Sequence, residues 1–354
     1  MFVKFKRALT LSVSAIILAA ALIMPSGCSG GSNMYVSFKT YTDTNPTKHH
    51  EFENTEINVV SNYNDKYDFI MVLKKMGNND IFNVYSPYMV ENVGDKPNSD
   101  LEGKTLFMNT DLGVSDWFGP YIVSADNNAD GDRKMGEFTG GNHDYLNGSG
   151  GSATGRTESI TLKVNGKDIE GDYEGYADEI DIYWTNYIQA NNTKKEDGSG
   201  REVLKEMYHI NYKGDNEWHV DQQIEFLEDV TIQTYYGMQA INTAWNEKVK
   251  FGDGEWLEGD TTVQSESETE NKITLCKSEH YLELNLDTTY GLGKREHMDS
   301  LSKTAFVSSY GKNNSKTYYF IVQGSQKFSA GTIDGWKGTY KFYYGEPTAT
   351  TSEQ

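Results

Sequence analysis

Cysteine, proline and helical patterns are all scarce in this chain. Only two cysteines, Cys28 and Cys276, and six prolines occur among its 354 residues. Two thiols can form at most one disulfide, so a small disulfide-stabilised scaffold is excluded and an apolar core must hold the folded part together. Amphipathic helical periodicity is nearly absent, with residues 67–76 as the ambiguous stretch. After residue 31 the sequence also has no G-x-S-x-G turn, no phosphate-binding glycine loop and no H-E-x-x-H pair.

The chain has fewer basic than acidic residues, and it has many aromatic residues. The 32 Lys and Arg residues stand against 52 Asp and Glu residues, a formal net charge of -20. Such a chain repels polyanions, so no nucleic-acid partner is expected. The 24 tyrosines and the many β-branched residues form segments broken by Gly, Asn and Asp, which is typical of β-rich proteins.

The clearest predicted strands are long and follow one another closely. An Asn165-Gly166 pair between two extended runs predicts a hairpin. We expect an all-β fold, a large antiparallel β-sandwich or supersandwich with long loops, whose strands pair sequentially through turns. The strands expected in the middle of the chain cover residues 157–164, 167–169, 179–190, 203–212 and 217–227.

The first residues have the parts of a secretory signal. Residues 1–7 are basic, residues 8–24 are apolar and uncharged, and small residues precede Cys28. The run is slightly short for a membrane-spanning helix. Ser26-Gly27-Cys28 resembles the processing site of bacterial lipoproteins, although Pro25 stands where that family has an aliphatic residue. The resemblance implies cleavage before Cys28 and attachment of a diacylglycerol to its thiol; an ordinary secreted protein is the alternative.

This reading divides the chain into four parts. We expect a signal peptide at 1–27, a lipidated cysteine with a Ser/Gly spacer at 28–34, and a flexible tail at 347–354. Residues 35–346 form the β-rich region, as one large domain or as two with a break near residues 191–200. The expected location is the extracellular face of a bacterial membrane, at a Gram-positive cell surface, where the lipid anchor binds the membrane and a polysaccharide is the partner.

A long acidic loop contains a calcium-binding pattern. Residues 126–137 fit D-x-[DN]-x-[DN]-G-x5-E, in which hard oxygens surround Ca²⁺ and Gly131 permits the sharp turn. Arg133 occupies a place that is usually aliphatic, and the flanks do not look helical. An isolated calcium loop or a merely solvated acidic loop is therefore expected, rather than an EF-hand domain. The predicted ligands are Asp126, Asn128, Asp130, Asp132 and Glu137.

Asn142-His143-Asp144-Tyr145 follows directly, beside a pair of glycines. His is a general base near neutral pH, and an Asn side chain can neutralise a uronate carboxylate so that the neighbouring proton is removed. The set resembles the catalytic grouping of polysaccharide lyases, which act by β-elimination; the alternative is a loop that holds its own turn. The resemblance implies catalytic roles for Asn142, His143, Tyr145, Arg156, Tyr235 and Tyr236.

A third group lies on the predicted aromatic strands. A hairpin would bring two histidines onto paired strands, although two ligands fall short of a metal site. The segment 218–239 resembles strands of the supersandwich of galactose-mutarotase-like proteins. The expected sugar-binding residues are Trp184, Trp218, His209 and His219.

Three functions stay open at this point. The first is a cell-surface lyase that degrades a uronic-acid-containing polysaccharide. The second is a non-catalytic glycan-binding or adhesion lipoprotein. The third is a structural protein of the cell envelope.

Overall fold

A computed structural model describes ten stretches of the chain, and the following statements concern them. The described residues belong to one compact unit. In the described part, no helix has the length and hydropathy needed to cross a membrane. The described stretches are residues 32–109, 117–127, 137–146, 150–194, 200–241, 243–258, 263–264, 270–301, 305–309 and 315–345.

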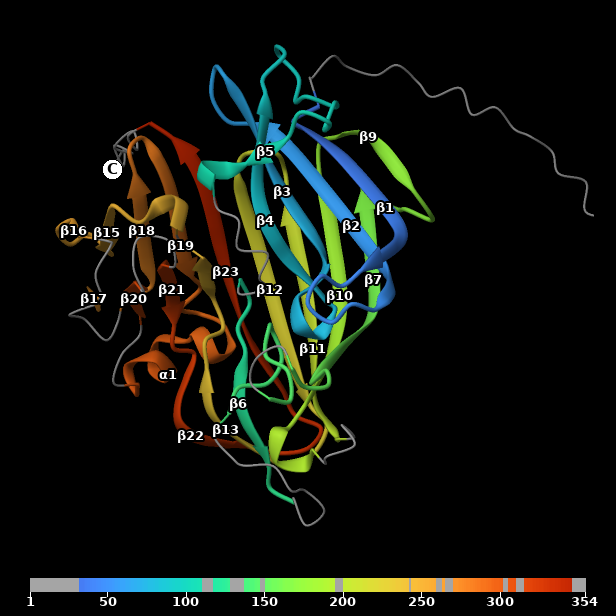
Figure 1. Cartoon of the computed structure of the whole chain (residues 1–354). Coiled ribbons are helices and arrows are strands. Elements are labelled where there is room, and N and C mark those ends of the chain that lie inside the picture. The colour runs from blue at the N-terminus through green and yellow to red at the C-terminus, as the bar shows by residue number, and fades with distance from the viewer. Residues whose placement is uncertain are drawn as a thin grey trace, which may run out of the picture. The chain divides into compact units, whose positions relative to one another are not determined.

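A ten-stranded antiparallel sheet is the largest element (Figure 1). Its order is β16-β15-β18-β19-β23-β12-β11-β10-β7-β8. Its strands are β7 (Gly155–Val164), β8 (Lys167–Asp168), β10 (Ile180–Gln189), β11 (Glu202–Tyr212), β12 (Glu217–Phe226), β15 (Lys248–Phe251), β16 (Leu257–Glu258), β18 (Lys272–Lys277), β19 (His280–Leu286) and β23 (Ile333–Tyr344).

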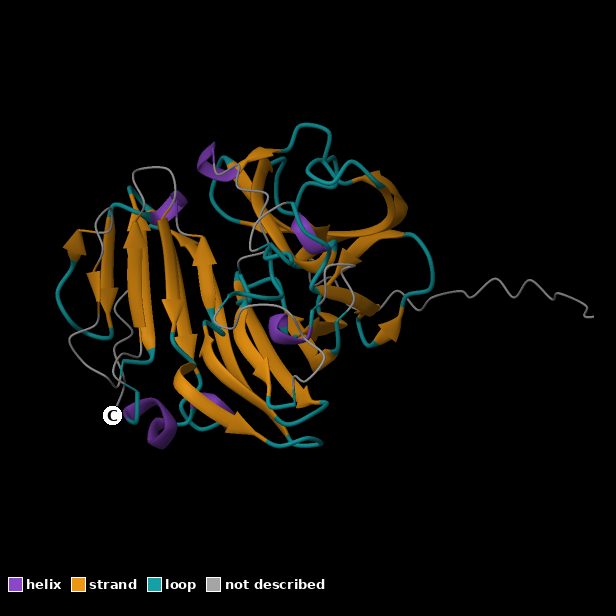
Figure 2. Ribbon diagram, turned by 60° about the horizontal axis from the view of Figure 1, so that its bottom comes forward, coloured by secondary structure: helices purple, strands orange, loops and turns teal. Residues whose placement is uncertain are grey.

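Three further sheets accompany it. The six-stranded sheet, in the order β5-β4-β3-β2-β1-β9, contains β1 (Met34–Thr44), β2 (Glu51–Asn62), β3 (Tyr67–Met76), β4 (Ile81–Glu91), β5 (Thr105–Leu106) and β9 (Tyr173–Ala177). The two smaller sheets contain β6 (Tyr121–Ala125), β13 (Val230–Tyr235) and β22 (Val322–Phe328), and β14 (Gln239–Ile241), β17 (Val263–Gln264), β20 (Ala305–Ser309) and β21 (Ser315–Tyr319). The described helices are short; the α-helix α1 covers Arg295–Asp299 (Figure 2).

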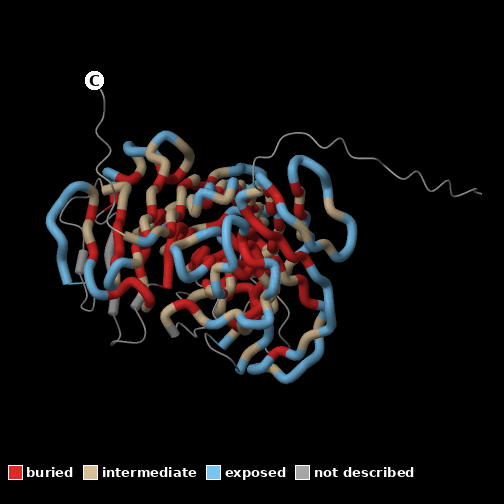
Figure 3. Tube along the Cα trace, turned by 90° about the horizontal axis from the view of Figure 1, so that it is seen from above, coloured by how far each residue is buried: buried red, intermediate tan, exposed pale blue. Residues whose placement is uncertain are grey.

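The ten-stranded and six-stranded sheets pack face to face through aromatic side chains. Phe69 of β3 stacks on Phe342 of β23 with ring centroids 4.8 Å apart, and Phe82 of β4 meets Trp184 of β10 at 5.5 Å. Most of the buried residues belong to one core cluster in this interior, and exposed residues lie in the turns and on the outer faces of strands (Figure 3). The all-β sandwich prediction is therefore confirmed.

Local chemistry explains the turns and the strand that was ambiguous. Asn165 and Gly166 both have positive φ, 49° and 76°, as the turn between β7 and β8 requires. Residues 67–76 form the strand β3, which is apolar on both faces: Phe69, Met71 and Leu73 lie in the main core, and Ile70 and Val72 lie in a second, smaller cluster. β10 and β11, on either side of residues 191–200, pair along one sheet.

The expectation of sequential pairing is wrong for the centre of the large sheet. β12 pairs on one side with β11, its neighbour in sequence, and on the other side with the distant β23. The buried side chains of β23 alternate with polar ones and continue the core face of β12, so the sheet takes β23 in its middle. Hydrophobic alternation defines a strand but not its partner.

Candidate functional site

A polar groove of about 540 Å³ lies on the face of the ten-stranded sheet that points away from the sandwich core. β11, β12, β19 and β23 each contribute to it. Residues on these strands alternate between the core and the groove, since successive side chains point to opposite faces. The side chains that define the groove are His209, Asn211, His219, Asp221, Asn285, Lys337 and Thr339.

An ion pair crosses the groove floor between β12 and β23. The Nζ atom of Lys337 lies 2.6 Å from Oδ2 of Asp221 and 4.4 Å from the ring centroid of Tyr290. The hydrogen bond to Asp221 raises the pKa of Lys337. Because an ammonium group has three protons, Lys337 can donate to a ligand while it keeps its bond to Asp221.

A second set of contacts holds His209. Its ring stacks on Tyr183 with centroids 4.3 Å apart and an angle of 6° between the planes. Its Nε2 lies 2.8 Å from Oδ1 of Asp181, which also accepts a hydrogen bond from Nδ2 of Asn211 at 3.0 Å. A carboxylate only accepts, so Nε2 carries the proton, and in a neutral ring Nδ1 is an acceptor. The groove thus offers a donor at Lys337 and an acceptor at His209.

His219 lies diagonally from His209 on the same face. His209 pairs with Asp221, and Asn211 pairs with His219, in the register of β11 and β12. The imidazole of His219 is exposed, with its Nε2 3.9 Å from a carboxylate oxygen of Glu217. Within the described stretches, no group of three His, Cys, Asp or Glu side chains is placed to hold a metal ion.

The two tryptophans predicted to bind sugar face the opposite side of the sheet. Trp184 is 1% exposed and stacks on Tyr208 at 4.7 Å, while Trp218 is 3% exposed and stacks on Tyr212 at 4.3 Å. Trp218 has the opposite strand parity to its neighbour His219, so both cannot share one face. Both indoles pack the core, and the groove is lined without their rings.

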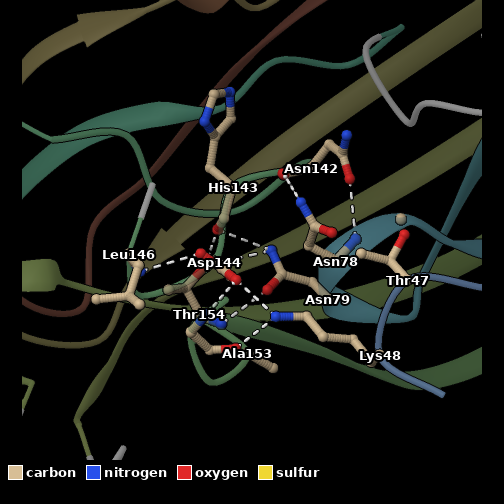
Figure 4. A network of polar contacts seen from close by, with 12 residues as sticks. Thr47, Lys48, Asn78, Asn79, Asn142, His143, Asp144, Leu146, Ala153 and Thr154 are labelled. Atoms are coloured by element: carbon tan, nitrogen blue, oxygen red, sulfur yellow. Dashed lines mark hydrogen bonds and ion pairs between the residues drawn. The ribbon is translucent and has the colours of Figure 1, made fainter. Parts of the chain in front are cut away.

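Hydrogen bonds to the first helical turn after β3, η1 (Gly77–Asn79), hold the predicted lyase loop in place (Figure 4). Oδ1 of Asn142 accepts from the backbone N–H of Asn78 at 2.9 Å. The carboxylate of Asp144 is fully buried and lies 2.6 Å from Nζ of Lys48. Asn142 and Asp144 thus make contacts that hold the loop in its own conformation, which is the alternative to a catalytic role.

The imidazole of His143 points away from that network (Figure 4). Its ring lies 5.1 Å from the ring of Phe138, and Phe138 lies 5.6 Å from Tyr236. The ring of Phe138 therefore contacts both His143 and Tyr236, which come from segments far apart in sequence. Tyr145 lies elsewhere in the loop, with its ring 5.5 Å from Nζ of Lys194.

Tyr235 and Arg156 have other surroundings. The Tyr235 side chain has no exposed surface, stacks on Tyr121 at 4.3 Å and accepts a hydrogen bond from Nε1 of Trp336 at 2.9 Å. Burial raises the pKa of Tyr235. Arg156 is exposed on β7 and pairs with Glu202 through its Nε. In this conformation Tyr235 is out of reach of a polysaccharide.

The predicted calcium loop and lipidation site are mostly outside the described residues. Oδ1 of Asp126 accepts a hydrogen bond from the hydroxyl of Thr231 at 2.7 Å. The backbone carbonyl of Glu137 accepts from Nδ2 of Asn191 at 3.2 Å. Both calcium binding and lipidation stay predictions. The residues outside the described part are Cys28, Asn128, Asp130 and Asp132.

Sequence reasoning missed the β23 side of the groove. Lys337 and Thr339 alternate with the buried Trp336 and Tyr340, so the outward direction of their side chains could have been predicted from the sequence. Their position beside Asp221 could not have been predicted, because the register between β12 and β23 joins segments far apart in sequence.

Comparisons with known proteins give no family. No protein-family model and no curated protein match the chain. Among solved structures, heparan sulfate lyase HepC from Pedobacter heparinus is similar over 88% of this chain and 37% of its own, with 8% identity and a TM-score of 0.33. Galactose 1-epimerase from Lactobacillus acidophilus NCFM matches over 88% of this chain and 100% of its own, with 10% identity and a TM-score of 0.33.

A third solved structure is of another kind. The YidC insertase matches over 87% of this chain and 41% of its own, with 10% identity and a TM-score of 0.28. The chain thus spans well under half of the lyase and of the insertase. The fold class follows from the chain's own sheets.

Proposed function

We propose that this protein binds an extracellular glycan in the groove of the ten-stranded sheet, from a lipid anchor at Cys28. The observation that carries the proposal is the groove floor, where Asp221 fixes Lys337 and Asp181 fixes His209. Sugar hydroxyls are recognised by closely spaced donors and acceptors held in place by other contacts. Side chains fixed before binding lose little conformational entropy when the ligand arrives.

The groove holds both kinds of hydrogen-bonding group. Nζ of Lys337 donates, and Nδ1 of His209 accepts. The Nδ2 of Asn211 already donates to Glu179 and Asp181, so its Oδ1 is presented as a further acceptor. Tyr183, stacked on His209 and 36% exposed, extends the floor with aromatic surface.

The charge of the groove favours an uncharged glycan. Lys337 is neutralised by Asp221, and Asp287 adds a second carboxylate to the lining. The chain as a whole carries a net charge of -20. A uronic-acid polymer would meet repulsion here, so we expect neutral glycans to bind more tightly.

A glycan array followed by calorimetric titration of the purified full-length chain tests this function. Lys337→Met and His209→Ala are expected to weaken binding about tenfold, a change of about 1.4 kcal/mol each. Lys39→Met is the matched control, because Lys39 forms an exposed ion pair with Glu174 on the six-stranded sheet. Equal affinity of all three variants would overturn the groove as the binding site.

A second candidate is β-elimination of an acidic polysaccharide at the His143 loop. The observation that favours it is the placement of His143 and Tyr236 on the ring of Phe138. There His143 would remove the proton and Tyr236 would protonate the leaving oxygen.

Incubation with a panel of uronic-acid polymers, with and without calcium, tests this activity. Unsaturated products absorb in the ultraviolet, and His143→Ala should abolish their formation. No rise in absorbance with any polymer would refute the lyase. Glycan binding that persists in His143→Ala would support the binding function alone.

A further inference from the structure

A second cavity, of about 400 Å³, opens at one end of the sandwich. It lies between the turn from β2 to β3, the first residue of β19 and the last residue of β23. Its lining consists of Tyr63, Tyr67, His280 and Tyr344, together with the polar turn residues 64–66. We call it the tyrosine pocket.

The tyrosine pocket is distinct from the groove. His280 pairs with Tyr344, and Asn285 pairs with Thr339, in the register of β19 and β23. The two pairs are five residues apart, a distance of about 17 Å along a strand. They also differ in parity, so His280 and Tyr344 point toward the sandwich interior while Asn285 and Thr339 point into the groove.

The inner wall of the pocket has a defined hydrogen-bonding state. The hydroxyl of Tyr63 lies 2.9 Å from Nδ1 of His280 and 3.1 Å from the backbone oxygen of Tyr343. A carbonyl only accepts, so the single hydroxyl proton of Tyr63 goes to Tyr343. The Nδ1 of His280 must then donate to Tyr63, and Nε2 is left as an acceptor. Burial lowers the pKa of His280, which keeps this neutral form at pH 7.

The turn that forms the other wall is fixed by its own side chain. Oδ1 of Asn64 accepts hydrogen bonds from the backbone N–H groups of Lys66 and Tyr67, both at 2.9 Å. The backbone oxygen of Asn64 accepts from Nδ2 of Asn92 at 3.1 Å. The backbone of Tyr67 is therefore held before any ligand arrives, as is typical of Asx turns.

Two partly exposed tyrosine rings, those of Tyr67 and Tyr344, also line the pocket. Tyr67 is 39% exposed and Tyr344 is 42% exposed, high values for aromatic side chains that line a cavity. An exposed ring offers a flat apolar face, and the apolar face of a pyranose stacks on such a ring. Asp65 and Lys66 are exposed at the rim and add one acceptor and one donor that the hydroxyls of a bound sugar can reach.

We propose that the tyrosine pocket is a second saccharide site, which takes one neutral pyranose ring of a glycan against Tyr67 and Tyr344. A hydroxyl of the sugar donates to Nε2 of His280, and others bond the turn residues Asp65 and Lys66. This site does not depend on the groove. With two sites on opposite faces of the β19–β23 pair, the protein engages a dense glycan surface at two points, which increases avidity without any new contact.

Calorimetric titration of the purified full-length chain with neutral hexasaccharides of glucose, galactose, mannose and N-acetylglucosamine tests the proposal. The expected result is two sites per chain, one of which is weakened about tenfold by Tyr67→Ala or Tyr344→Ala. Tyr67→Phe should keep that site, because it keeps the ring. Tyr41→Ala is the matched control, since Tyr41 is 37% exposed on β1.

The groove variant separates the two proposals. Lys337→Met should weaken only the other site. Unchanged binding in Tyr67→Ala and Tyr344→Ala, or loss of the site in Tyr67→Phe, would overturn the tyrosine pocket while leaving the groove intact. If no hexasaccharide binds the wild-type chain, both sites are refuted. Should an alanine variant fail to fold, His280→Phe gives the same test, since it keeps a ring beside Tyr63 and removes the Nε2 acceptor.

Discussion

A carboxylic acid buried in the middle of the sandwich makes the stability of this protein depend on pH. Glu206 on β11 is 3% exposed. Its Oε1 accepts hydrogen bonds from the hydroxyls of Tyr121 at 2.8 Å and Tyr208 at 2.9 Å, and Oε2 accepts from Nδ2 of Asn186 at 3.4 Å. Burial raises the pKa of Glu206 to about 7, although the three hydrogen bonds oppose that rise.

The sign and size of the effect follow from this pKa. A raised pKa means that the folded state favours the protonated acid, so the contribution is complete below about pH 4.5 and is lost as the pH rises through about 7. A difference of about 2.5 pH units at 1.36 kcal/mol per unit corresponds to about 3 kcal/mol. We therefore expect Glu206→Gln, which cannot ionise, to gain about 3 kcal/mol relative to the wild type between pH 4.5 and pH 8.

Urea unfolding at a series of pH values measures this change. The free energy of unfolding of both proteins is taken from the midpoints, with the slope m held common if it does not differ. Leu282→Ala is the control, since it removes buried apolar surface and no charge, and its cost of about 2–5 kcal/mol should be the same at every pH. A difference between Glu206→Gln and the wild type that stays constant with pH would show that the ionisation of Glu206 does not affect stability in this range.

Three further predictions concern other parts of the chain. Lys48→Met leaves the carboxylate of Asp144 buried without its ion pair, and urea unfolding should show a loss of about 3–5 kcal/mol, whereas Lys39→Met should change stability by under about 1 kcal/mol. Cys28→Ser should move the protein from the membrane fraction to the medium and abolish fatty-acid labelling; a variant that stays in the membrane fraction would contradict lipidation. If residues 126–137 bind calcium, a concentration of 100 times Kd should raise the stability by about 2.7 kcal/mol, and a chelator should reverse it; no shift at millimolar calcium would refute the site.

The sequence predicts the strands well because alternation is a local property. The turn at Asn165 and Gly166, for example, needs positive φ at both positions, and these two residue types tolerate it better than others. The same local logic fails for residues 67–76, where both faces are apolar because the strand β3 is covered on both sides. For such an apolar run, only the neighbouring strands decide between a helix and a strand, and they are not visible in the local sequence.

In the candidate sites, too, features set by neighbouring residues could be predicted from the sequence, and features set by distant segments could not. That His209 and His219 share one face could be predicted from sequence, because a short turn joins β11 and β12 and the face then follows from parity. Trp184 and Trp218 pack the core rather than the groove, since aromatic content does not tell which face a core will cover. The tyrosine pocket was missed altogether, because it combines a turn near residue 65 with strand ends near residues 280 and 344.

The position of β23 in the centre of the large sheet has a kinetic consequence. Gln222 pairs with Trp336 across more than one hundred positions of sequence, and closing so long a loop costs entropy before any contact compensates for it. Until β23 docks, β12 presents an open edge on which another chain can pair. Because Asp221 and Lys337 meet only when β23 has docked, the groove cannot form before that step of folding. Ligand binding at this groove therefore also reports that the sheet is complete.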